Sequence, residues 1–351
     1  MKLITITSRF LPGNLMEYCN ERKIEIIILN QDHFSIASKW ILIFKLLGDS
    51  FKVLSHLKEL RRKNTIISVG YITVPLLIYR SLGLIKKRTS IIWEGFFLHN
   101  HRYFPAFKKL FRLFFCEDDS LLVYSEFEKN LYSNAFNLKS SNIHFIPLVF
   151  EPKPNETLHN QYTKEVDWNN ITSDFYFSGG YSHRDYASLI EIFRKESTNL
   201  VICSSELNHE LRNIKMPDNV ILLNDVAREE FAELVRRSKA CIVLIKSNSG
   251  AAGQLFAIEV MYYSKIIIAS STDILKEMIS NRENGFLVTD PILEIPFIIK
   301  EIEDELTDFV LLKKKAKDKV TTLNSKINYN HHMNIALERA GEYRRPLELS
   351  Q

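Results

Sequence analysis

The sequence predicts an α/β protein made of two doubly wound, Rossmann-like domains, and two observations lead to this prediction. Short runs rich in Val, Ile and Leu alternate with segments of helical periodicity along the chain. Strands that helices cover on both faces have continuous apolar runs, so this alternation indicates parallel βαβ units. The runs form two series separated by a polar stretch, and 351 residues are enough for two domains of ordinary size.

The elements follow in order along the chain. In the first series the predicted strands are 2–7, 24–29, 65–69, 90–93, 120–124 and 142–146, and residues 14–23 have helical periodicity. In the second series the predicted strands are 174–178, 199–204, 219–223, 240–245, 265–270 and 285–288, with helical segments at 185–196, 228–238 and 274–281.

The domain boundaries come from a change in composition. Residues 151–171 are polar, contain two prolines and have no periodicity, which is typical of a linker. We therefore expect a Rossmann-like domain at 1–150, a linker at 151–171 and a second Rossmann-like domain at 172–325. Residues 326–351 are expected to form a C-terminal helix that packs back on the first domain.

Composition limits the classes of function. The four cysteines are far apart without CxxC spacing, so we interpret them as free core thiols of a reducing compartment. The N-terminus does not have the pattern of a signal peptide, and no apolar run reaches 18 residues. A cytoplasmic protein is the resulting expectation. The net charge of +4 does not by itself call for a nucleic-acid partner.

The charge is unevenly distributed. Residues 37–115 have about a dozen more Lys and Arg than Asp and Glu, and the basic residues are interleaved with apolar and aromatic ones. One interpretation is a set of amphipathic core helices with solvated lysines. The other is a face that rests on anionic lipid or binds an anionic acceptor. No DNA- or RNA-binding motif accompanies the charge, so nucleic acid is not an expected partner.

The segment from Cys241 to Asp290 is the most informative part of the chain. An apolar strand leads into a loop of small residues, and the loop opens a helix. Backbone N–H groups of such a loop can approach an anion, and the helix N-terminus adds partial positive charge. We therefore expect a phosphate-bearing ligand at Ser249, Gly250, Ala251, Ala252, Gly253 and Gln254.

Glu259 is a lone acid on an apolar helix. A buried carboxylate needs partners, because an unpaired buried charge is costly. A ribose diol offers two hydroxyl donors and is one suitable partner. A neighbouring basic side chain is the other, and the sequence leaves both open.

Residues 249–288 resemble the donor-binding half of bacterial GT-B glycosyltransferases. They are most similar to the large group of retaining sugar-nucleotide transferases, the glycosyl transferases group 1 or family 4 type. The matching positions are Gly250 to Gly253, Glu259, Ser264, Ala269 and Ser270, Glu277, and Asn284 and Gly285. The similarity extends over about residues 121–290. It implies a GT-B fold, with the donor diphosphate at Gly179, Gly180 and Arg184, the nucleotide base at the backbone of Val226, and the ribose at Glu259.

The sequence also departs from that family. The family usually has two glutamates with seven residues between them, and the first falls here on Ala251 or Gly250. That glutamate normally contacts the transferred sugar, so retention and inversion both stay open. The family's arginine near Gly180 is also missing, which leaves Arg184 and Lys246 to neutralise the diphosphate.

The acceptor side is expected in the first domain. Glu94, His99 and His101 follow the predicted strand 90–93, and ligands bind beyond the carboxyl ends of parallel strands. We therefore expect them to face the cleft between the domains. An inverting transfer needs a general base, and Glu94 and His99 are the candidates. The alternative for Glu94 is a salt bridge to a nearby basic residue, and the expected role of His101 is acceptor binding. Arg9 either contacts an acceptor phosphate or is solvated.

The expected function is transfer of a sugar from a nucleotide-sugar, UDP- or GDP-linked, to a lipid-linked saccharide or surface polysaccharide. Capsule, lipopolysaccharide and exopolysaccharide are the candidate products, made at the inner face of the plasma membrane. No metal is expected, since no acidic metal motif is found in the donor region. Two alternatives stay open: a sugar-nucleotide epimerase on the same scaffold, and a non-catalytic nucleotide-sugar-binding partner subunit.

Overall fold

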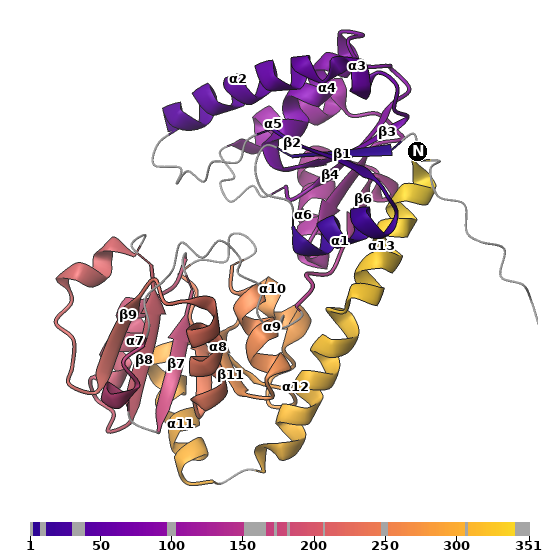
Figure 1. Ribbon diagram of the computed structural model, residues 1–351. Coiled ribbons are helices and arrows are strands. Elements are labelled where there is room, and N and C mark those ends of the chain that lie inside the picture. The colour runs from indigo at the N-terminus through magenta and orange to yellow at the C-terminus, as the bar shows by residue number, and fades with distance from the viewer. Residues whose placement is uncertain are drawn as a thin grey trace, which may run out of the picture. The chain divides into compact units, whose positions relative to one another are not determined.

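The chain divides into two compact units, which are shown in Figure 1. Unit 1 consists of Met1–Val149 and Lys326–Gln351, and unit 2 is Phe150–Ser325. The computed structural model describes residues 3–7, 12–29, 39–96, 103–150, 166–171, 174–180, 183–205, 208–246, 252–305 and 308–340, without the side chains of residues 39–46, 209 and 210.

Unit 1 has a six-stranded parallel sheet in the order β2-β1-β3-β4-β5-β6. Its strands are β1 (Leu3–Thr7), β2 (Glu25–Ile28), β3 (Thr65–Val69), β4 (Ser90–Glu94), β5 (Ser120–Val123) and β6 (Ile143–Phe145). Each lies where an apolar run predicted a strand. The doubly wound fold predicted for this half of the chain is therefore confirmed.

Helices cover both faces of this sheet. They are α1 (Gly13–Glu21), α2 (Lys39–Ser55), α3 (Leu57–Leu60), α4 (Thr73–Ser81), α5 (Phe104–Phe114), α6 (Glu126–Phe136) and α13 (Lys326–Arg339), with short 3₁₀ turns at Gly70–Ile72 and Ser140–Asn142. Neighbouring residues of β4 show why the middle of a strand is apolar on both sides: Trp93 packs with α4, α5 and α6, whereas Ile92 packs on the opposite face with α1 and α13. Successive side chains of a strand point to opposite faces, so both sets must be apolar.

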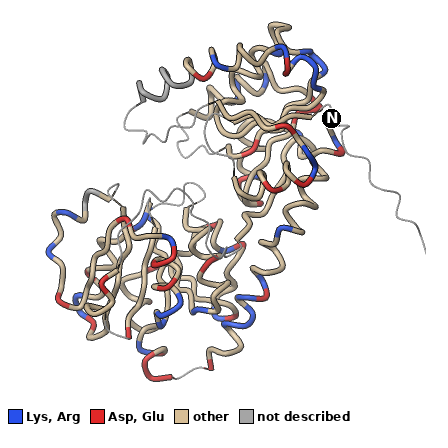
Figure 2. Tube along the Cα trace, in the orientation of Figure 1, with Lys and Arg blue, Asp and Glu red and all other residues tan. Residues whose placement is uncertain are grey.

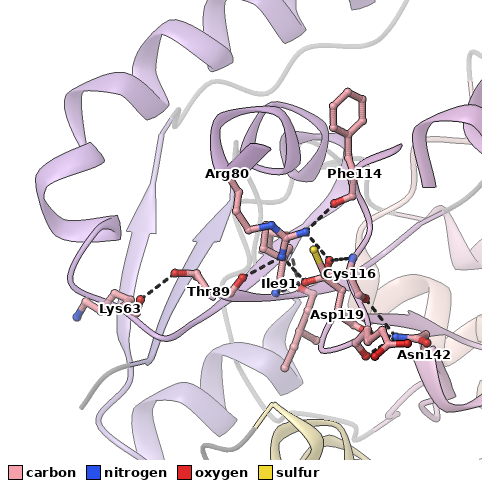
Figure 3. Close-up of polar contacts among 11 residues, drawn as sticks. Lys63, Arg80, Thr89, Ile91, Phe114, Cys116, Asp119 and Asn142 are labelled. Carbon is pink, nitrogen blue, oxygen red and sulfur yellow. Dashed lines mark hydrogen bonds and ion pairs between the residues drawn. The ribbon is translucent and has the colours of Figure 1, made fainter. Parts of the chain in front are cut away.

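A buried ion pair joins several elements of unit 1 (Figure 3). Arg80 of α4 binds Asp119 through two bonds, Nη1 to Oδ1 at 2.5 Å and Nη2 to Oδ2 at 2.6 Å. The guanidinium also donates to the carbonyl oxygens of Thr89 and Phe114, and Asp119 accepts from the backbone N–H of Ile91 and of Cys116. Since both oxygens of Asp119 and both terminal nitrogens of Arg80 have partners, the pair fixes the turns before β4 and β5 against α4.

Unit 2 has the second six-stranded parallel sheet, in the order β12-β11-β10-β7-β8-β9. Its strands are β7 (Phe175–Gly179), β8 (Asn199–Ser204), β9 (Val220–Asn224), β10 (Ala240–Val243), β11 (Ile266–Ser270) and β12 (Phe286–Val288). All of them coincide with predicted strands. The sheet order is that of a dinucleotide-binding Rossmann fold, in which the first strand lies at the centre.

The helices of unit 2 are α7 (Tyr186–Phe193), α8 (Arg228–Arg237), α9 (Gln254–Tyr262), α10 (Asp273–Met278), α11 (Pro291–Glu303) and α12 (Phe309–Leu323), with 3₁₀ turns at Trp168–Asn170 and His209–Asn213. One face of the sheet packs on α7 and α11. On the other face Phe177 of β7, Phe231 of α8 and Phe256 of α9 meet edge to face, with ring centroids 5.2–5.8 Å apart. Among the described residues, none of the helices has the length and apolar character of a membrane span.

The cysteines agree with the prediction except at one position. All four are free, and Cys19, Cys203 and Cys241 are buried as expected of core thiols. Cys116 is exposed instead. Its backbone N–H is bound to Asp119 in the turn before β5, so the residue lies at the surface and not in a strand.

Candidate functional site

The candidate site lies at the carboxyl edge of the unit 2 sheet. There β7 and β10 are hydrogen-bonded neighbours, although β8 and β9 come between them in the chain. At such a switch point the connections leave in opposite directions, so the loops open a crevice in which open α/β sheets bind ligands. Gly179 and Gly180 end β7 at this point, and the turn before α9 follows β10.

Gly180 and Arg184 form the first part of the site. Gly180 has φ +138°, and a Cβ atom there would lie 2.5 Å from Nη2 and 2.6 Å from Nε of Arg184. The guanidinium therefore lies directly against the glycine backbone, and its Nε donates to the carbonyl oxygen of Gly179 at 3.1 Å. Burial lowers the pKa of Arg184, yet an arginine stays charged at neutral pH. The structure thus brings the predicted glycines and the predicted cation together.

A second pairing fixes the position of Lys246. Residues 183–185 run antiparallel to residues 244–246, with Asp185 N–H bound to Leu244 O and Lys246 N–H bound to His183 O, both at 3.0 Å. Lys246 is exposed and lies three residues after the end of β10, the strand next to β7 in the sheet. The backbone pairing therefore holds the two predicted cations, Arg184 and Lys246, on adjacent segments of one edge.

Gly253 caps the N-terminus of α9. Its φ is +90°, and a Cβ atom would lie 3.1 Å from Val243 and 3.2 Å from Ile245. Only glycine combines that backbone conformation with so close an approach to β10. Gln254 is the buried first residue of the helix, and Ala252 is half-buried before it. Ser249, Gly250 and Ala251 lie outside the described residues.

Glu259 forms an ion pair with a basic side chain, which is one of the two partners predicted for it. Its carboxylate is buried in α9, and Oε1 lies 2.7 Å from Nη2 of Arg228, the first residue of α8. Burial raises the pKa of Glu259, and the charge of Arg228 opposes that rise. Arg228 itself is partly exposed, so the pair lies between the sheet core and the surface. A neighbouring basic side chain is the alternative to the ribose that the sequence predicts, but the sequence does not say which residue it is.

Val226 follows β9 at the same edge, and its side chain is buried. Its backbone forms a hydrogen bond with the Cys203 thiol at the end of β8. Burial raises the pKa of Cys203 to about 12, so the thiol is neutral and serves as a packing and hydrogen-bonding group. The chain at Val226 is therefore held against β8, two residues before Arg228.

A pocket of about 430 Å³ also opens at this end of unit 2. It lies beyond β8 and β9, and its polar lining is supplied by Ser205, Asn208, Arg212, Asn224 and Asp225. No sequence motif predicts this pocket. Its lining comes from the segment after β8 and the end of β9, which have no motif and meet only through strand pairing.

In unit 1, Glu94 ends β4 and is fully buried. Its carboxylate accepts hydrogen bonds from Tyr124 Oη at 3.1 Å and Tyr329 Oη at 3.4 Å. Burial raises the pKa of Glu94 to about 7, although both hydroxyls favour the ionised form. The expected exposure of this carboxylate to a ligand is therefore not found, because two tyrosines cover it. Among the residues that the structure describes, Glu94 has no salt-bridge partner either.

Three other predicted residues of the acceptor side, Arg9, His99 and His101, lie outside the described residues. Across the ranges that the structure describes, no group of three His, Cys, Asp or Glu side chains is arranged to hold a metal ion.

The arrangement in unit 2 suits an anion. Two cations, a glycine turn at the end of β7 and the N-terminus of α9 lie at one edge of one sheet. Backbone N–H groups and guanidinium donors together neutralise charge that is spread over several phosphate oxygens. This chemistry can hold a diphosphate and can stabilise one that leaves during a group transfer.

Comparisons with known proteins agree with this geometry. Residues 173–318 match the family Glycosyl transferases group 1. HepE from Anabaena, solved in complex with UDP and glucose, superposes with a TM-score of 0.67 at 12% identity over 96% of this chain and 99% of that chain. The lipopolysaccharide outer core galactosyltransferase WaaB in its apo form gives 0.64 at 13% identity, over 96% and 99%. Sucrose-phosphate synthase from Thermosynechococcus elongatus gives 0.66 at 13%, over 97% and 98%. No curated protein sequence matches the chain.

Proposed function

We propose that the protein is a glycosyltransferase, because residues 173–318 of unit 2 match the family Glycosyl transferases group 1 and the chain has the GT-B fold. The donor is a nucleotide-sugar, UDP-linked in the first instance. The acceptor is a lipid-linked saccharide or a growing surface polysaccharide such as capsule, lipopolysaccharide or exopolysaccharide. The protein works in the cytoplasm at the inner face of the plasma membrane.

One observation supports the donor proposal above the others. Gly180 lies against the Arg184 guanidinium at the switch point between β7 and β10, and Gly253 opens α9 on the other side of β10. In the proposal the diphosphate binds here, with Lys246 and the loop from Ser249 to Gln254 completing its contacts. HepE was solved with UDP-glucose as well, at a TM-score of 0.67 and 11% identity, which makes UDP the first nucleotide to test.

The nucleoside extends in the proposal from the diphosphate toward α8. The base lies along the backbone of Val226, and the ribose hydroxyls bind Glu259 beside Arg228. Because Arg228 favours the ionised carboxylate, Glu259 can accept hydrogen bonds from a diol. The ion pair and the ribose contact are therefore compatible, because the Glu259 carboxylate can accept from the Arg228 guanidinium and still has acceptor positions left for the ribose hydroxyls.

The acceptor side involves unit 1. His99 is the proposed proton acceptor for the acceptor hydroxyl, and Arg9 and His101 are proposed acceptor contacts. Glu94 enters the proposal as a positioning residue, since its carboxylate is bound to Tyr124 and Tyr329. It anchors the end of β4, from which the segment with His99 and His101 departs.

Calorimetric titration with UDP, GDP, UDP-glucose and UDP-galactose tests the donor proposal, and a matched pair of variants locates the site. Lys246 and Lys239 lie beyond opposite ends of β10. We expect Lys246→Ala to weaken nucleotide-sugar binding about tenfold, since a charge-assisted hydrogen bond contributes about 1.5 kcal/mol or more. Lys239→Ala, which removes a contact with Glu303, should bind as the native protein does.

If Lys246→Ala bound the nucleotide as tightly as Lys239→Ala, the diphosphate would have to lie elsewhere. If no nucleotide bound at all, the transferase proposal would fail. NMR of the product of a turnover reaction then gives the anomer, which decides between retention and inversion. Donor interconversion without an acceptor would instead indicate an epimerase.

A further inference from the structure

An exposed apolar stripe runs along α2 of unit 1. Leu47, Phe51 and Leu54 are spaced four and three residues apart, which places them on one side of a helix, and Phe51 is 71% exposed. The opposite side of α2 is buried, with Val53 in the unit 1 core. The helix therefore has an apolar stripe that the protein core does not use.

The stripe continues onto neighbouring elements. Tyr79 Oη of α4 donates to the carbonyl oxygen of Ser50, the residue before Phe51, at 2.9 Å. Arg61, just after α3, donates to the carbonyl oxygen of Leu84 at 2.7 Å, and Leu82 at the end of α4 is exposed. These contacts join the end of α2, α3 and the end of α4 into one surface, which we call the α2–α4 surface.

Six basic residues belong to this surface. They are Lys58, Arg61, Arg62, Lys86, Lys87 and Arg88, and all of them are exposed. Within the described residues none of the six forms an ion pair with a carboxylate. Figure 2 shows basic residues gathered around α3. The positive charge is therefore available to an anionic partner.

Acidic residues do little to offset this charge. Residues 37–115 contain 15 Lys and Arg but 3 Asp and Glu. Two of the three acids, Asp49 and Glu94, are buried, and the third, Glu59, is bound to His56 at 3.2 Å. A second copy of the chain is a poor partner, because two such surfaces would place like charges opposite one another.

Unit 2 offers an instructive contrast. Phe297 of α11 is 74% exposed, so an exposed aromatic ring alone is not special to unit 1. Glu294 precedes Phe297 in α11, and the end of the helix and the residues after it carry the acids Glu301, Glu303, Asp304 and Glu305 beside the single base Lys300. A cluster of six exposed bases near an exposed aromatic residue therefore distinguishes the α2–α4 surface from α11.

We propose that the α2–α4 surface docks on a membrane that contains anionic lipid. Phe51 and the leucines of the stripe enter the headgroup layer, while the six bases lie near lipid phosphates. Each base near such a surface strengthens binding about fivefold, and the effect is screened by salt. Docking would keep the enzyme beside the lipid-linked acceptor, and this purpose rests on the proposed function. The binding to the membrane itself does not depend on catalysis.

Vesicle sedimentation tests this proposal with the full chain. Vesicles of phosphatidylcholine with an equal part of phosphatidylglycerol should bind the protein at least tenfold more tightly than phosphatidylcholine alone, and 0.5 M NaCl should remove most of that difference. Phe51→Glu should weaken binding to the anionic vesicles about tenfold. Phe297→Glu, an equally exposed ring on unit 2, should bind as the native protein does.

A second pair of variants tests the charge. The triple change Lys86→Glu, Lys87→Glu and Arg88→Glu should reduce binding at least a hundredfold. The same change at Lys313, Lys314 and Lys315 of α12 should leave binding within about twofold, because that basic run belongs to unit 2. All variants alter surface positions, and thermal unfolding checks that each is folded.

Three results would overturn the proposal. They are equal binding to neutral and anionic vesicles, unchanged binding of Phe51→Glu, and equal loss with both triple changes. If the protein were a dimer in solution and Phe51→Glu made it monomeric, the surface would instead be an interface with a second copy of the chain. UDP binding is measured on the same samples to separate the two proposals. If the native protein binds UDP but shows no preference for anionic vesicles, the membrane proposal fails and the proposed function stands.

Discussion

Removing the Arg228 side chain should destabilise unit 2 in a way that depends on pH. Arg228 Nη2 lies 2.7 Å from Oε1 of Glu259, which is 3% exposed, whereas the arginine side chain is 40% exposed. Two unit charges about 4 Å apart interact by about 4 kcal/mol near a protein surface. Exposure of the arginine screens this interaction, so we expect Arg228→Met to lower the free energy of unfolding by about 2 kcal/mol at pH 8.

The sign of the pH dependence follows from the pKa of Glu259. Burial already raises this pKa, and loss of the opposing arginine raises it further. A folded state that holds its proton more tightly than the unfolded state loses stability as pH rises. The cost of Arg228→Met should therefore be smaller at pH 5 than at pH 8, because a larger fraction of the Glu259 carboxyl carries a proton at the lower pH.

Urea denaturation measures this cost, with hydrogen exchange of α9 peptides as the readout so that unit 2 is followed alone. Glu259→Gln is the matched background, because it keeps the size of the side chain and cannot ionise. In that background Arg228→Met should cost less than about 0.5 kcal/mol, as expected of a partly exposed side chain without a charged partner. An equal cost in both backgrounds, or a larger cost at pH 5, would refute the reasoning.

Two further predictions concern the switch point and Glu94. Gly180→Ala places a Cβ atom against Arg184 at a φ of +138°, so we expect at least tenfold weaker UDP binding by calorimetry. The control Gly13→Ala, at a position with open space, should bind UDP as the native protein does. Equal UDP affinities of the two variants would contradict the proposed position of the diphosphate. For Glu94 the folded pKa of about 7 exceeds the ordinary 4.5, so its contribution to stability, complete below about pH 4.5, is lost as pH rises to about 7. The glutamine of Glu94→Gln does not titrate. Between pH 4.5 and 8 the free energy of unfolding of this variant, measured in urea, should therefore rise by about 3 kcal/mol relative to that of the native protein. If the two free energies changed in parallel with pH, a buried titrating carboxyl would be contradicted.

The inner strands of both sheets could be predicted from the sequence because they are buried on both faces. Trp93 and Ile92, for example, belong to cores on opposite sides of one sheet, so successive residues of that strand are apolar. The glycine loops were equally accessible, since Gly180 and Gly253 adopt positive φ where other residues are strained. Local physics determines these features, and a short window of sequence is enough to recognise them.

The partners of the buried acids could not be predicted in the same way. Glu259 pairs with Arg228 only because α8 and α9 pack on the same face of β7, as the rings of Phe231 and Phe256 do. Glu94 meets Tyr329 across 235 positions of sequence. Both contacts depend on tertiary packing between elements that are distant in the chain, so no local pattern identifies them.

The place of α13 in unit 1 has a consequence for biosynthesis. Tyr329, Met333, Ala336 and Leu337 complete the core that covers one face of the unit 1 sheet, together with Tyr18 and Ile92. These residues leave the ribosome after all of unit 2, because residues 150–325 are inserted between the two segments of unit 1. During translation unit 2 can therefore fold as soon as it emerges, whereas unit 1 retains an uncovered apolar sheet face until α13 is made. Unit 1 is thus started before unit 2 but completed after it, and a stop codon within α13 damages the core of a unit whose strands were made long before.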